Sequence, residues 1–541
     1  MARGENKQIA INMFAQIAVF GIQFCISFFL TPFIVRTLGV EAYGFVGLSN
    51  NIIGYMQVVT VALNSMAARF ISIEYHNGNF QKANQYFSSV FYANSILNVV
   101  ISVICLCFAF FLEYIINIPN TLIPDVKCLF LLLTVNTVLN LTFNVYTVSP
   151  FIKNRLDLNS IRNLISTIWR TIILLFLFLL FAPRVSYLGI ASVLASVYLV
   201  IANIVIKRKL TPEFHLSRKN YDWKSTREIL SSGVWNLLIS VSTMLEKGFD
   251  LLFANWFIGN AIMGMLSVVS TITVLIPRVL KMANSSFAPK ITEYGAKGDI
   301  EGIKRNVFKS VKIMSIMVIL PLSVLYVYGE SFFTLWLPNQ NSSLLYVITI
   351  LTTLDMIFGM PLEVCWNIFG ATNKVKMPAI AMFVTGGLTF LSLLVLLYIY
   401  KDPTAQLICL ASARTFWNII KNLTFLPFYG ARCLNLKWNF FYHSMAKPVL
   451  GIFIALSICQ TYRFMIVPNT WVEFILSSIL VCLSALIIGS LFILPKKGYK
   501  IYFPKNINID SSSINYTELL LPVIVNKNVL YIQMLQMGRP L

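Results

Sequence analysis

The chain has 541 residues, of which 57% are apolar and only 12% are charged, and its mean hydropathy is +0.75. A water-soluble globular protein of this composition would expose far too much apolar surface, so the composition predicts an integral membrane protein. Lys and Arg outnumber Asp and Glu by 42 to 21, which gives a net charge of +21. In a soluble protein such a charge would suggest nucleic-acid binding.

The apolar residues gather in fourteen runs, each near the length of about 20 residues that a helix needs to cross a bilayer. Strands of a membrane barrel are about ten residues long and alternate in character, so the runs predict an all-α polytopic membrane protein with about 14 transmembrane helices. The runs lie near residues 9–35, 42–68, 87–112, 122–148, 161–182, 186–206, 229–257, 261–284, 312–336, 343–369, 378–400, 404–428, 447–466 and 471–494.

Basic residues are distributed unevenly around these spans. If the N-terminus is cytoplasmic, 29 Lys and Arg residues fall on the cytoplasmic side up to Lys505, whereas five fall outside, six within spans and two in the tail. This bias follows the positive-inside rule, so we expect both termini to be cytoplasmic. Topology then explains the basicity, and we expect no nucleic-acid partner.

An internal repeat divides the spans into two lobes. Leu38 to Gly44 aligns with Ile258 to Gly264 at an offset of 220 residues. Six helices in each half is an even number, so the repeat is expected to be parallel, with two lobes around one central cavity. Glu74-Tyr75 followed by Gly78-Asn79 aligns with Glu293-Tyr294 followed by Gly298-Asp299, with a one-residue slip.

The predicted organisation has five parts, and the last two transmembrane helices are an appendage to the repeat. These parts are an N-lobe at 1–206, a basic cytoplasmic linker at 207–228, a C-lobe at 229–430, helices thirteen and fourteen at 431–495, and a cytoplasmic tail at 496–541.

Ionisable residues inside spans are informative because each costs roughly 2.5 to 3.5 kcal/mol at the middle of a membrane, so they must pair or face water. The spans hold ten such residues, nine of them in the C-lobe. They are Arg170, Glu246, Lys247, Asp250, Arg278, Lys281, Asp355, Glu363, Arg414 and Lys421.

The N-lobe carries amides instead, with Asn136, Asn140 and Asn144 at helical spacing of i, i+4 and i+8. We predict that these amides meet a sugar-like hydroxylated surface, and that five cations hold an anionic group such as a diphosphate. The alternative is structural, since carboxylates could neutralise the cations and the amide row could join helices. The five cations are Arg170, Arg278, Lys281, Arg414 and Lys421.

The intramembrane carboxylates are candidates for coupling transport to a proton or Na⁺ gradient, because such groups can be protonated or bind a cation. These are Glu246, Asp250, Asp355 and Glu363. We expect no other cofactor and no metal site, since the cysteines form no CxxC pair and the three histidines lie far apart. No phosphate-binding loop is present and the cytoplasmic loops are short, so we expect a transporter and not an enzyme.

Two segments resemble a known family. Arg36 to Gly44 resembles the Arg-x-Leu-Gly-x-x-x-x-Gly start of polysaccharide-transporter flippases, and Phe287 to Ile291, leading into Glu293-Tyr294, is similar to the same family. Asp250 is similar to an acidic residue that the family often carries in helix seven. The resemblance covers roughly residues 8–495 and agrees with fourteen helices in two six-helix lobes plus two.

The family comprises the Wzx-type lipid-linked oligosaccharide flippases of the multidrug/oligosaccharidyl-lipid/polysaccharide exporter superfamily. The resemblance implies alternating access, turning an undecaprenyl-diphosphate-linked glycan from the cytoplasmic to the periplasmic leaflet of the bacterial inner membrane for surface polysaccharide such as O-antigen or capsule. The implied partners are membrane lipid, a polysaccharide polymerase and chain-length machinery. This sequence departs from a symmetric cationic cavity, because Arg170 is the one intramembrane cation of the N-lobe.

Three rival functions stay open. A peptidoglycan-precursor flippase and an ion-coupled multidrug antiporter would share the scaffold, and a cationic drug would favour an acidic cavity. A membrane polymerase or glycosyltransferase belongs to a different class and would be expected to carry a sizeable acidic catalytic loop.

Overall fold

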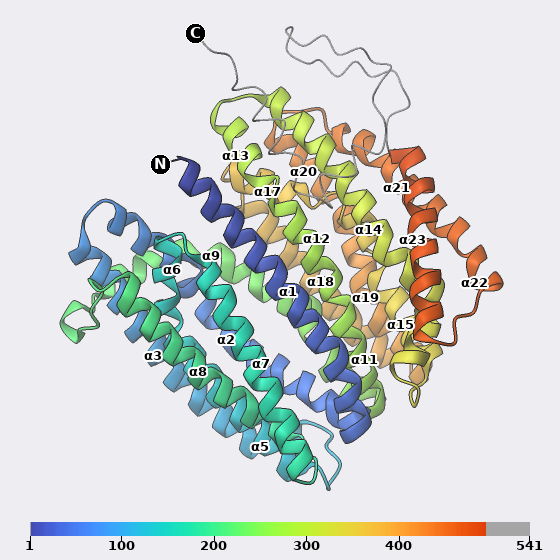
Figure 1. The fold of residues 1–541 in the computed structure, drawn as a ribbon, viewed down its shortest axis with the longest axis horizontal. Coiled ribbons are helices and arrows are strands. Elements are labelled where there is room, and N and C mark those ends of the chain that lie inside the picture. Colours follow the sequence, from blue (N-terminus) through green and yellow to red (C-terminus); the bar gives the residue numbers. More distant parts are fainter. Residues whose placement is uncertain (1, 494–541) are drawn as a thin grey trace. The chain divides into compact units, whose positions relative to one another are not determined.

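The computed structural model describes residues 2–493, and these fold entirely into helices and their connections, with no β-strand among them (Figure 1). Twelve helices in this range are long and apolar enough to cross a membrane. The chain is therefore a multi-pass, all-α membrane protein, as the apolar runs predict. The predicted tail at 496–541 lies outside the described residues.

The first six predicted spans form what we call the first half. Its helices are α1 (Ala2–Leu38), α2 (Val40–His76), α3 (Phe80–Phe110), α4 (Leu112–Ile115), α5 (Ile123–Thr142), the 3₁₀ turn η1 (Asn144–Thr147), α6 (Val148–Ile152), α7 (Leu156–Leu180) and α8 (Ser186–Leu210). The 3₁₀ turn η2 (Arg218–Asn220) lies in the predicted linker.

The next six spans form the second half, and two further long helices follow it. The second half comprises α9 (Trp223–Thr243), the π-helical turn η3 (Met244–Gly248), α10 (Asp250–Phe253), the π-helical turn η4 (Ala254–Ile258), α11 (Asn260–Thr273), α12 (Leu275–Ser285), α13 (Ala288–Ala296), α14 (Ile300–Trp336), α15 (Ser342–Thr353), α16 (Met356–Gly359), α17 (Val364–Ala371), α18 (Lys376–Ile399), α19 (Pro403–Leu423) and α20 (Phe425–Cys433). The chain continues with α21 (Phe440–Cys459), α22 (Thr461–Met465) and α23 (Trp471–Ile493).

All fourteen predicted spans fall on helical segments, but the spans at 229–257 and 404–428 are not among the twelve apolar helices. The first is interrupted by the two π-helical turns, and the second, α19, is rich in polar side chains. Turns of π-helix within a longer helix often mark functional sites. The two exceptional spans are therefore the first place to look for one.

The internal repeat is visible in the backbone. Gly39 (φ 88°) precedes α2 and Gly259 (φ 135°) precedes α11, while Gly78 (φ 77°) and Gly298 (φ 68°) occupy the next turns of the two halves. These are the four glycines with positive φ in the described part of the chain, and each pair is 220 residues apart. Positive φ favours glycine because it has no Cβ, so the same turn is built twice.

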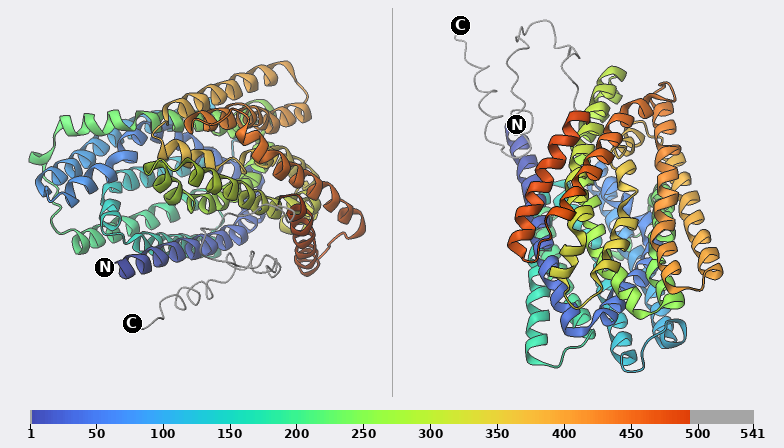
Figure 2. Two further views of the ribbon diagram at one scale, coloured as in Figure 1. Left: turned by 90° about the horizontal axis from the view of Figure 1, so that it is seen from above. Right: turned by 90° about the vertical axis from the view of Figure 1, so that its right-hand side faces the viewer.

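Packing follows the same division. In the first half α8 packs against α5 and α7, and α1 packs against α7. In the second half α14 is buried along most of its length, and α21 and α23, orange and red in Figures 1 and 2, lie against it. The two extra helices are therefore attached to the second half. The halves meet where α2 packs against both α9 and α11.

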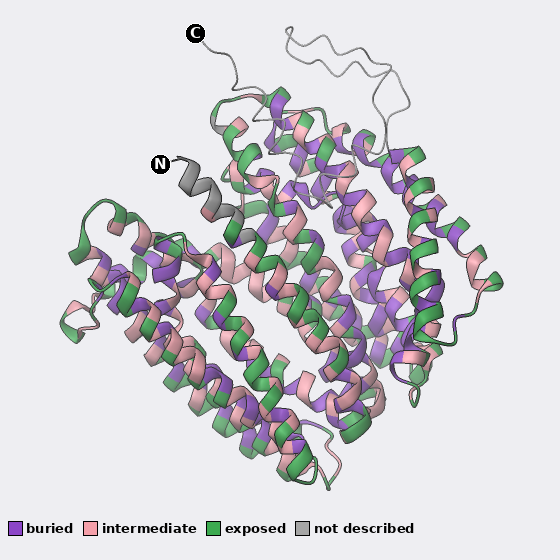
Figure 3. Ribbon diagram, viewed as in Figure 1, coloured by how far each residue is buried: buried purple, intermediate pink, exposed green. Residues whose placement is uncertain are grey.

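Exposed residues occur along many of the helices (Figure 3), and many of these residues are large and apolar. On α23 the exposed set recurs at three- and four-residue spacing, which is the period of one helical face. Such a face suits contact with lipid tails. The set comprises Val472, Ile475, Leu476, Ile479, Leu483, Ile487 and Leu491.

Candidate functional site

The two exceptional spans bring opposite charges together. Glu246 in η3 and Asp250 at the start of α10 face α19, where Lys421 Nζ lies 3.9 Å from Glu246 Oε2 and Arg414 Nη1 lies 3.7 Å from Asp250 Oδ2. Asn418 joins the first pair, since its Nδ2 donates to Glu246 Oε1 at 2.9 Å and its Oδ1 accepts from Lys421 Nζ at 2.5 Å. The charged residues that lower the apolarity of these two spans are thus the same residues that form the ion pairs between them.

A third ion pair lies in the same half, and we call the three pairs together the charged cluster of the second half. Lys281 Nζ of α12 lies 3.6 Å from Glu363 Oε1 next to α17, and the Lys281 side chain is 58% exposed. Arg414 also donates from Nη2 to the carbonyl of Thr352 at 3.1 Å. Lys247, Arg278 and Asp355 form no ion pair within 4.0 Å in the described range, and the two cations are exposed.

These contacts bear on the predicted roles. Lys281, Arg414 and Lys421, predicted to hold an anion, each have a carboxylate partner, as the structural alternative expects. An ion-paired cation can still meet a ligand if the pair exchanges partners. Both the anion-binding and the ion-coupling assignments therefore stay predictions.

The first half holds a cavity of about 420 Å³, lined by α1, α2, α5, α7 and α8 together with Thr271 of α11, and we call it the first-half cavity. The predicted residues Arg170, Asn136 and Asn140 all line it. The remaining polar lining consists of hydroxyls and one further amide, namely Ser27, Thr31, Tyr43, Asn50, Ser166, Thr167, Ser192, Ser196 and Thr271.

The amides of the first-half cavity are held in place by Ser196 of α8. Asn140 Nδ2 donates to Ser196 Oγ at 2.8 Å, and Ser196 Oγ donates to Asn136 Oδ1 at 2.5 Å. The Arg170 side chain is exposed, and it lines the cavity together with these polar side chains. The cavity thus combines one guanidinium with fixed amide and hydroxyl groups, whereas the other four predicted cations do not line it.

Asn144 does not continue the predicted amide row. α5 ends at Thr142 and Asn144 begins the 3₁₀ turn η1, so the i, i+4, i+8 spacing fails at its last member. Its Nδ2 donates to Asn64 Oδ1 at 3.2 Å, and Asn64 exchanges hydrogen bonds with Asn94. The contact of Asn144 with Asn64 joins η1 to α2, as the structural alternative expects.

One buried cation of α7 was not among the residues predicted from the sequence. Arg162 lies on the face of α7 that carries Ser166 and Arg170, and its exposed fraction is only 6%. The predicted span at 161–182 contains Arg162, but Arg162 was not among the predicted intramembrane cations. Its spacing of eight residues from Arg170 was the available signal, because i and i+8 share a helix face.

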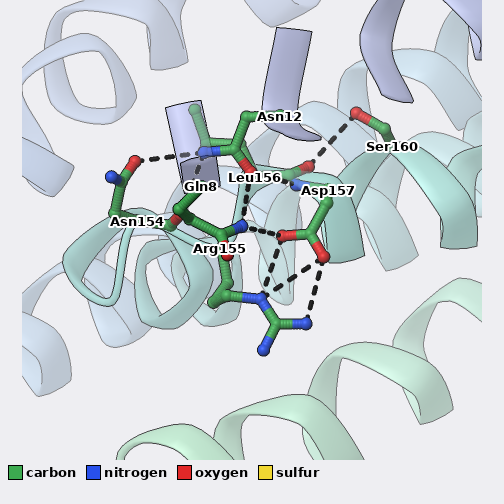
Figure 4. A network of polar contacts seen from close by, with 7 residues as sticks. All are labelled: Gln8, Asn12, Asn154, Arg155, Leu156, Asp157 and Ser160. Carbon is green, nitrogen blue, oxygen red and sulfur yellow. Dashed lines mark hydrogen bonds and ion pairs between the residues drawn. The ribbon is translucent and has the colours of Figure 1, made fainter. Parts of the chain in front are cut away.

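Close by, a polar network fastens α1 to the start of α7 (Figure 4). Asp157 accepts hydrogen bonds from Arg155 Nη2 and from Gln8 Nε2, both at 3.0 Å. Asn12 donates to the carbonyl of Asn154 at 2.9 Å and accepts from the backbone N–H of Asp157 at 3.0 Å.

The halves are also joined directly by polar contacts at the end predicted to lie outside. Asn255 Nδ2 donates to the carbonyl of Asn117 at 3.0 Å, while Asn117 Nδ2 donates to the carbonyl of Asn255 at 3.1 Å. The indole N–H of Trp256 donates to the carbonyl of Ile115 at 2.7 Å. Because Asn117 follows α4 and Asn255 lies in η4, this contact links the first half to the second.

Comparison with solved structures identifies the fold. The lipid II flippase MurJ in an inward closed conformation matches with a TM-score of 0.62 at 15% identity, covering 90% of this chain and 98% of that chain. A MATE transporter of Vibrio cholerae matches with a TM-score of 0.56 at 15% identity, covering 80% and 97%. At these identities the likeness shows the fold, which is that of the MATE and MurJ transporters.

Comparison by sequence identifies the family. The family described as polysaccharide biosynthesis protein matches residues 7–295, more than half of the chain. The membrane protein EpsK of Bacillus subtilis (strain 168), itself described as uncharacterized, is 30% identical over 481 residues, covering 88% of this chain and 93% of that protein. The chain therefore belongs to the family of polysaccharide biosynthesis proteins.

Proposed function

We propose that the protein carries an undecaprenyl-diphosphate-linked oligosaccharide from the cytoplasmic to the outer leaflet of the bacterial cytoplasmic membrane by alternating access. The product would feed a surface polysaccharide, such as an O-antigen or a capsule. The observation that carries this proposal is the first-half cavity, where Arg170 stands among Asn136, Asn140 and many hydroxyls.

The chemistry of the cavity matches such a head group. A guanidinium presents a planar fork of donors that binds two phosphate oxygens at once, and amides can both donate to and accept from sugar hydroxyls. Ser196 fixes Asn136 and Asn140 before any ligand arrives, so less side-chain entropy is lost on binding. Lys247 and Arg278 are exposed cations of the second-half spans that form no ion pair among the described residues, and they are candidates for a second contact with the diphosphate.

The charged cluster of the second half is the candidate for ion coupling. Protonation of Glu246 or Asp250 would release Lys421 or Arg414 from its partner, so a proton or Na⁺ at the carboxylate would change the charge offered to an anionic substrate. Asp355 and Glu363 belong to the same candidate set. This exchange would tie movement of the substrate to an ion gradient.

The lining of the first-half cavity weighs against a drug antiporter. It holds one cation and no carboxylate, whereas a cationic drug would be stabilised by negative charge. A flippase for a peptidoglycan precursor would need the same phosphate and sugar chemistry, so it remains the second candidate function. We further propose cytoplasmic termini, and a polymerase with chain-length machinery as downstream partners.

Deletion of the gene tests the proposal. Lipid-linked repeat units that accumulate should stay on the cytoplasmic side, where a membrane-impermeant sugar probe added to intact spheroplasts cannot reach them. Arg170→Ala should fail to restore probe access, whereas Arg184→Ala, a change at an exposed loop arginine, should restore it. Accumulation of single units on the outer side would mean that flipping survives the deletion and would contradict the proposal.

A further inference from the structure

Arg162 carries a buried guanidinium that no described side chain neutralises. Its exposed fraction is 6%, and its Nε and Nη1 atoms have no hydrogen-bond partner among the side chains that the structure describes. It forms no ion pair within 4.0 Å in that part of the chain either. A buried charge without a partner is costly, because the desolvation of the ion is not repaid.

The nearest carboxylate in the sequence is already engaged. Asp157, one turn before Arg162 on α7, is bound by Arg155 through Nε and Nη2 and by Gln8 through Nε2 (Figure 4). It is the one acidic residue in α7, and α8 contains none. The α7 and α8 helices therefore offer Arg162 no free carboxylate.

Neighbouring amides do not satisfy Arg162. Asn159 on α7 and Asn203 on α8 each have a buried Oδ1 atom without a hydrogen-bond donor. Asn159 is three residues before Arg162 on α7 and shares its helix face, yet Oδ1 of Asn159 and both Nε and Nη1 of Arg162 are unpaired among the described residues. In a purely structural contact, such groups would be expected to pair.

Arg162 extends the polar face of α7 beyond the first-half cavity, whose lining does not include it. Arg162, Ser166 and Arg170 follow one another at intervals of four residues on α7, and both Ser166 and Arg170 line the cavity. On α8, Ser196 lines the same cavity, and Asn203 lies seven residues further along the same helix face. Two arginines therefore stand about two turns apart on a polar track that leads from the cavity toward the beginning of α7.

We propose that Arg162 binds a phosphoryl group, and that Arg162 and Arg170 form successive binding positions for a phosphate-bearing ligand along α7. The phosphate would supply the oxygens that the protein does not offer to Nε and Nη1. This inference rests on the proposed function when the phosphate belongs to a lipid diphosphate. A free phosphate would satisfy the same guanidinium.

The test uses the purified full chain in detergent and compares Arg162→Met with Arg184→Met, a matched change at an exposed arginine. Thermal unfolding is measured without ligand and during titration with undecaprenyl diphosphate, inorganic pyrophosphate or undecaprenol. Arg162→Met should unfold at the same or a higher temperature than the wild type when no ligand is present, because an unpaired buried charge is removed. It should bind undecaprenyl diphosphate about tenfold or more weakly, since hydrogen bonds to charged groups are lost.

Comparing the three added ligands shows whether the bound phosphate belongs to a lipid or is free. Stabilisation by undecaprenyl diphosphate alone supports a lipid ligand, and equal stabilisation by pyrophosphate supports a free phosphate, while undecaprenol should have no effect. If Arg162→Met does not fold, Arg162→Lys carries the test, because it keeps the charge but loses the planar fork and should bind several times more weakly.

Three results would overturn the inference, and they are distinguishable. Unchanged binding by Arg162→Met together with a lower unfolding temperature would make Arg162 a structural residue. Loss of binding in Arg170→Met but not in Arg162→Met would overturn this inference and leave the proposed function standing. Failure of every diphosphate probe to bind the wild type would overturn both.

Discussion

Gly44 of α2 and Gly264 of α11, which occupy the same place in the two repeats, face each other where the halves meet. A Cβ added to Gly44 would lie 2.9 Å from both the Cα and the backbone nitrogen of Gly264. One turn further, Gly47 meets Ser267, again 220 residues away. The repeat thus places its own equivalent residues in contact, so the two halves approach each other through small side chains.

This contact predicts that a methyl group at position 44 is not tolerated. Gly44→Ala would push against the backbone of α11, which cannot rotate away as a side chain can, and should cost about 1 to 3 kcal/mol of stability. Gly54→Ala on the same helix is the control, because nothing lies within 4 Å of its added Cβ. Thermal unfolding in detergent should show a lower unfolding temperature for the first variant only; equal temperatures would refute the close approach.

The buried pair of Lys421 and Glu246 predicts a strong asymmetry between single and double changes. Lys421→Met leaves Glu246 buried without its partner and should destabilise the protein by about 3 to 5 kcal/mol. Adding Glu246→Gln should recover most of that loss. Lys297→Met, which breaks an exposed pair with Glu293, should change the unfolding temperature little. A single variant as stable as the double variant would show that the buried pair is not coupled.

Asn117 and Asn255 donate hydrogen bonds to each other's backbone carbonyls, and these bonds are predicted to hold the outer ends of the two halves together. Asn255→Ala removes hydrogen bonds worth about 0.5 to 1.5 kcal/mol each and should favour opening on that side. In a background without native cysteines, Thr271→Cys should then react faster with a membrane-impermeant maleimide. Asn120→Ala, at an exposed position of the same loop, should leave the rate unchanged. An equal rise in both variants would show that the hydrogen bonds between Asn117 and Asn255 do not hold this side closed.

The cap of α9 predicts a pH dependence outside the membrane. The Asp222 carboxylate accepts hydrogen bonds from Ser225 Oγ at 2.7 Å and from the backbone N–H of Ser225 at 2.9 Å, which hold the pKa of Asp222 below its ordinary value of 3.8. A lowered pKa means that this stabilisation is complete above the ordinary value and is lost as the pH falls through the lower, folded-state value. Asp222→Asn should therefore flatten the acid limb of the curve of stability against pH, whereas an unchanged limb would show that the cap does not titrate with folding.

Much of the fold could be predicted from the sequence because lipid imposes a simple rule on long helices. Apolar runs of about 20 residues marked all fourteen helical segments, and Gly39 and Gly259 marked the repeat because their turns need positive φ. The interruption of the seventh span by π-helical turns left no comparable signal. It follows from how α9, α10 and α19 pack, and packing is not local in sequence.

The candidate site could be predicted only in part. Arg170, Asn136 and Asn140 line one cavity, whereas the four predicted cations of the second half do not line it. Asn144 departs because α5 ends two residues before it, with no Gly or Pro at that point in the sequence. Which carboxylate each cation of the second half meets depends on the rotation of α19 against α10, and the spacing of charges along one helix does not determine that rotation.

The central claim is that this chain moves a diphosphate-linked oligosaccharide across a bilayer through a site that contains Arg170. The most direct measurement is the rate at which an undecaprenyl-diphosphate-linked repeat unit crosses the membrane of liposomes containing the purified protein, followed by a sugar probe outside. The wild type and Arg184→Ala should speed crossing well above protein-free liposomes, whereas Arg170→Ala should not. Crossing no faster than in protein-free liposomes, by a wild type that is folded and correctly inserted, would contradict the account.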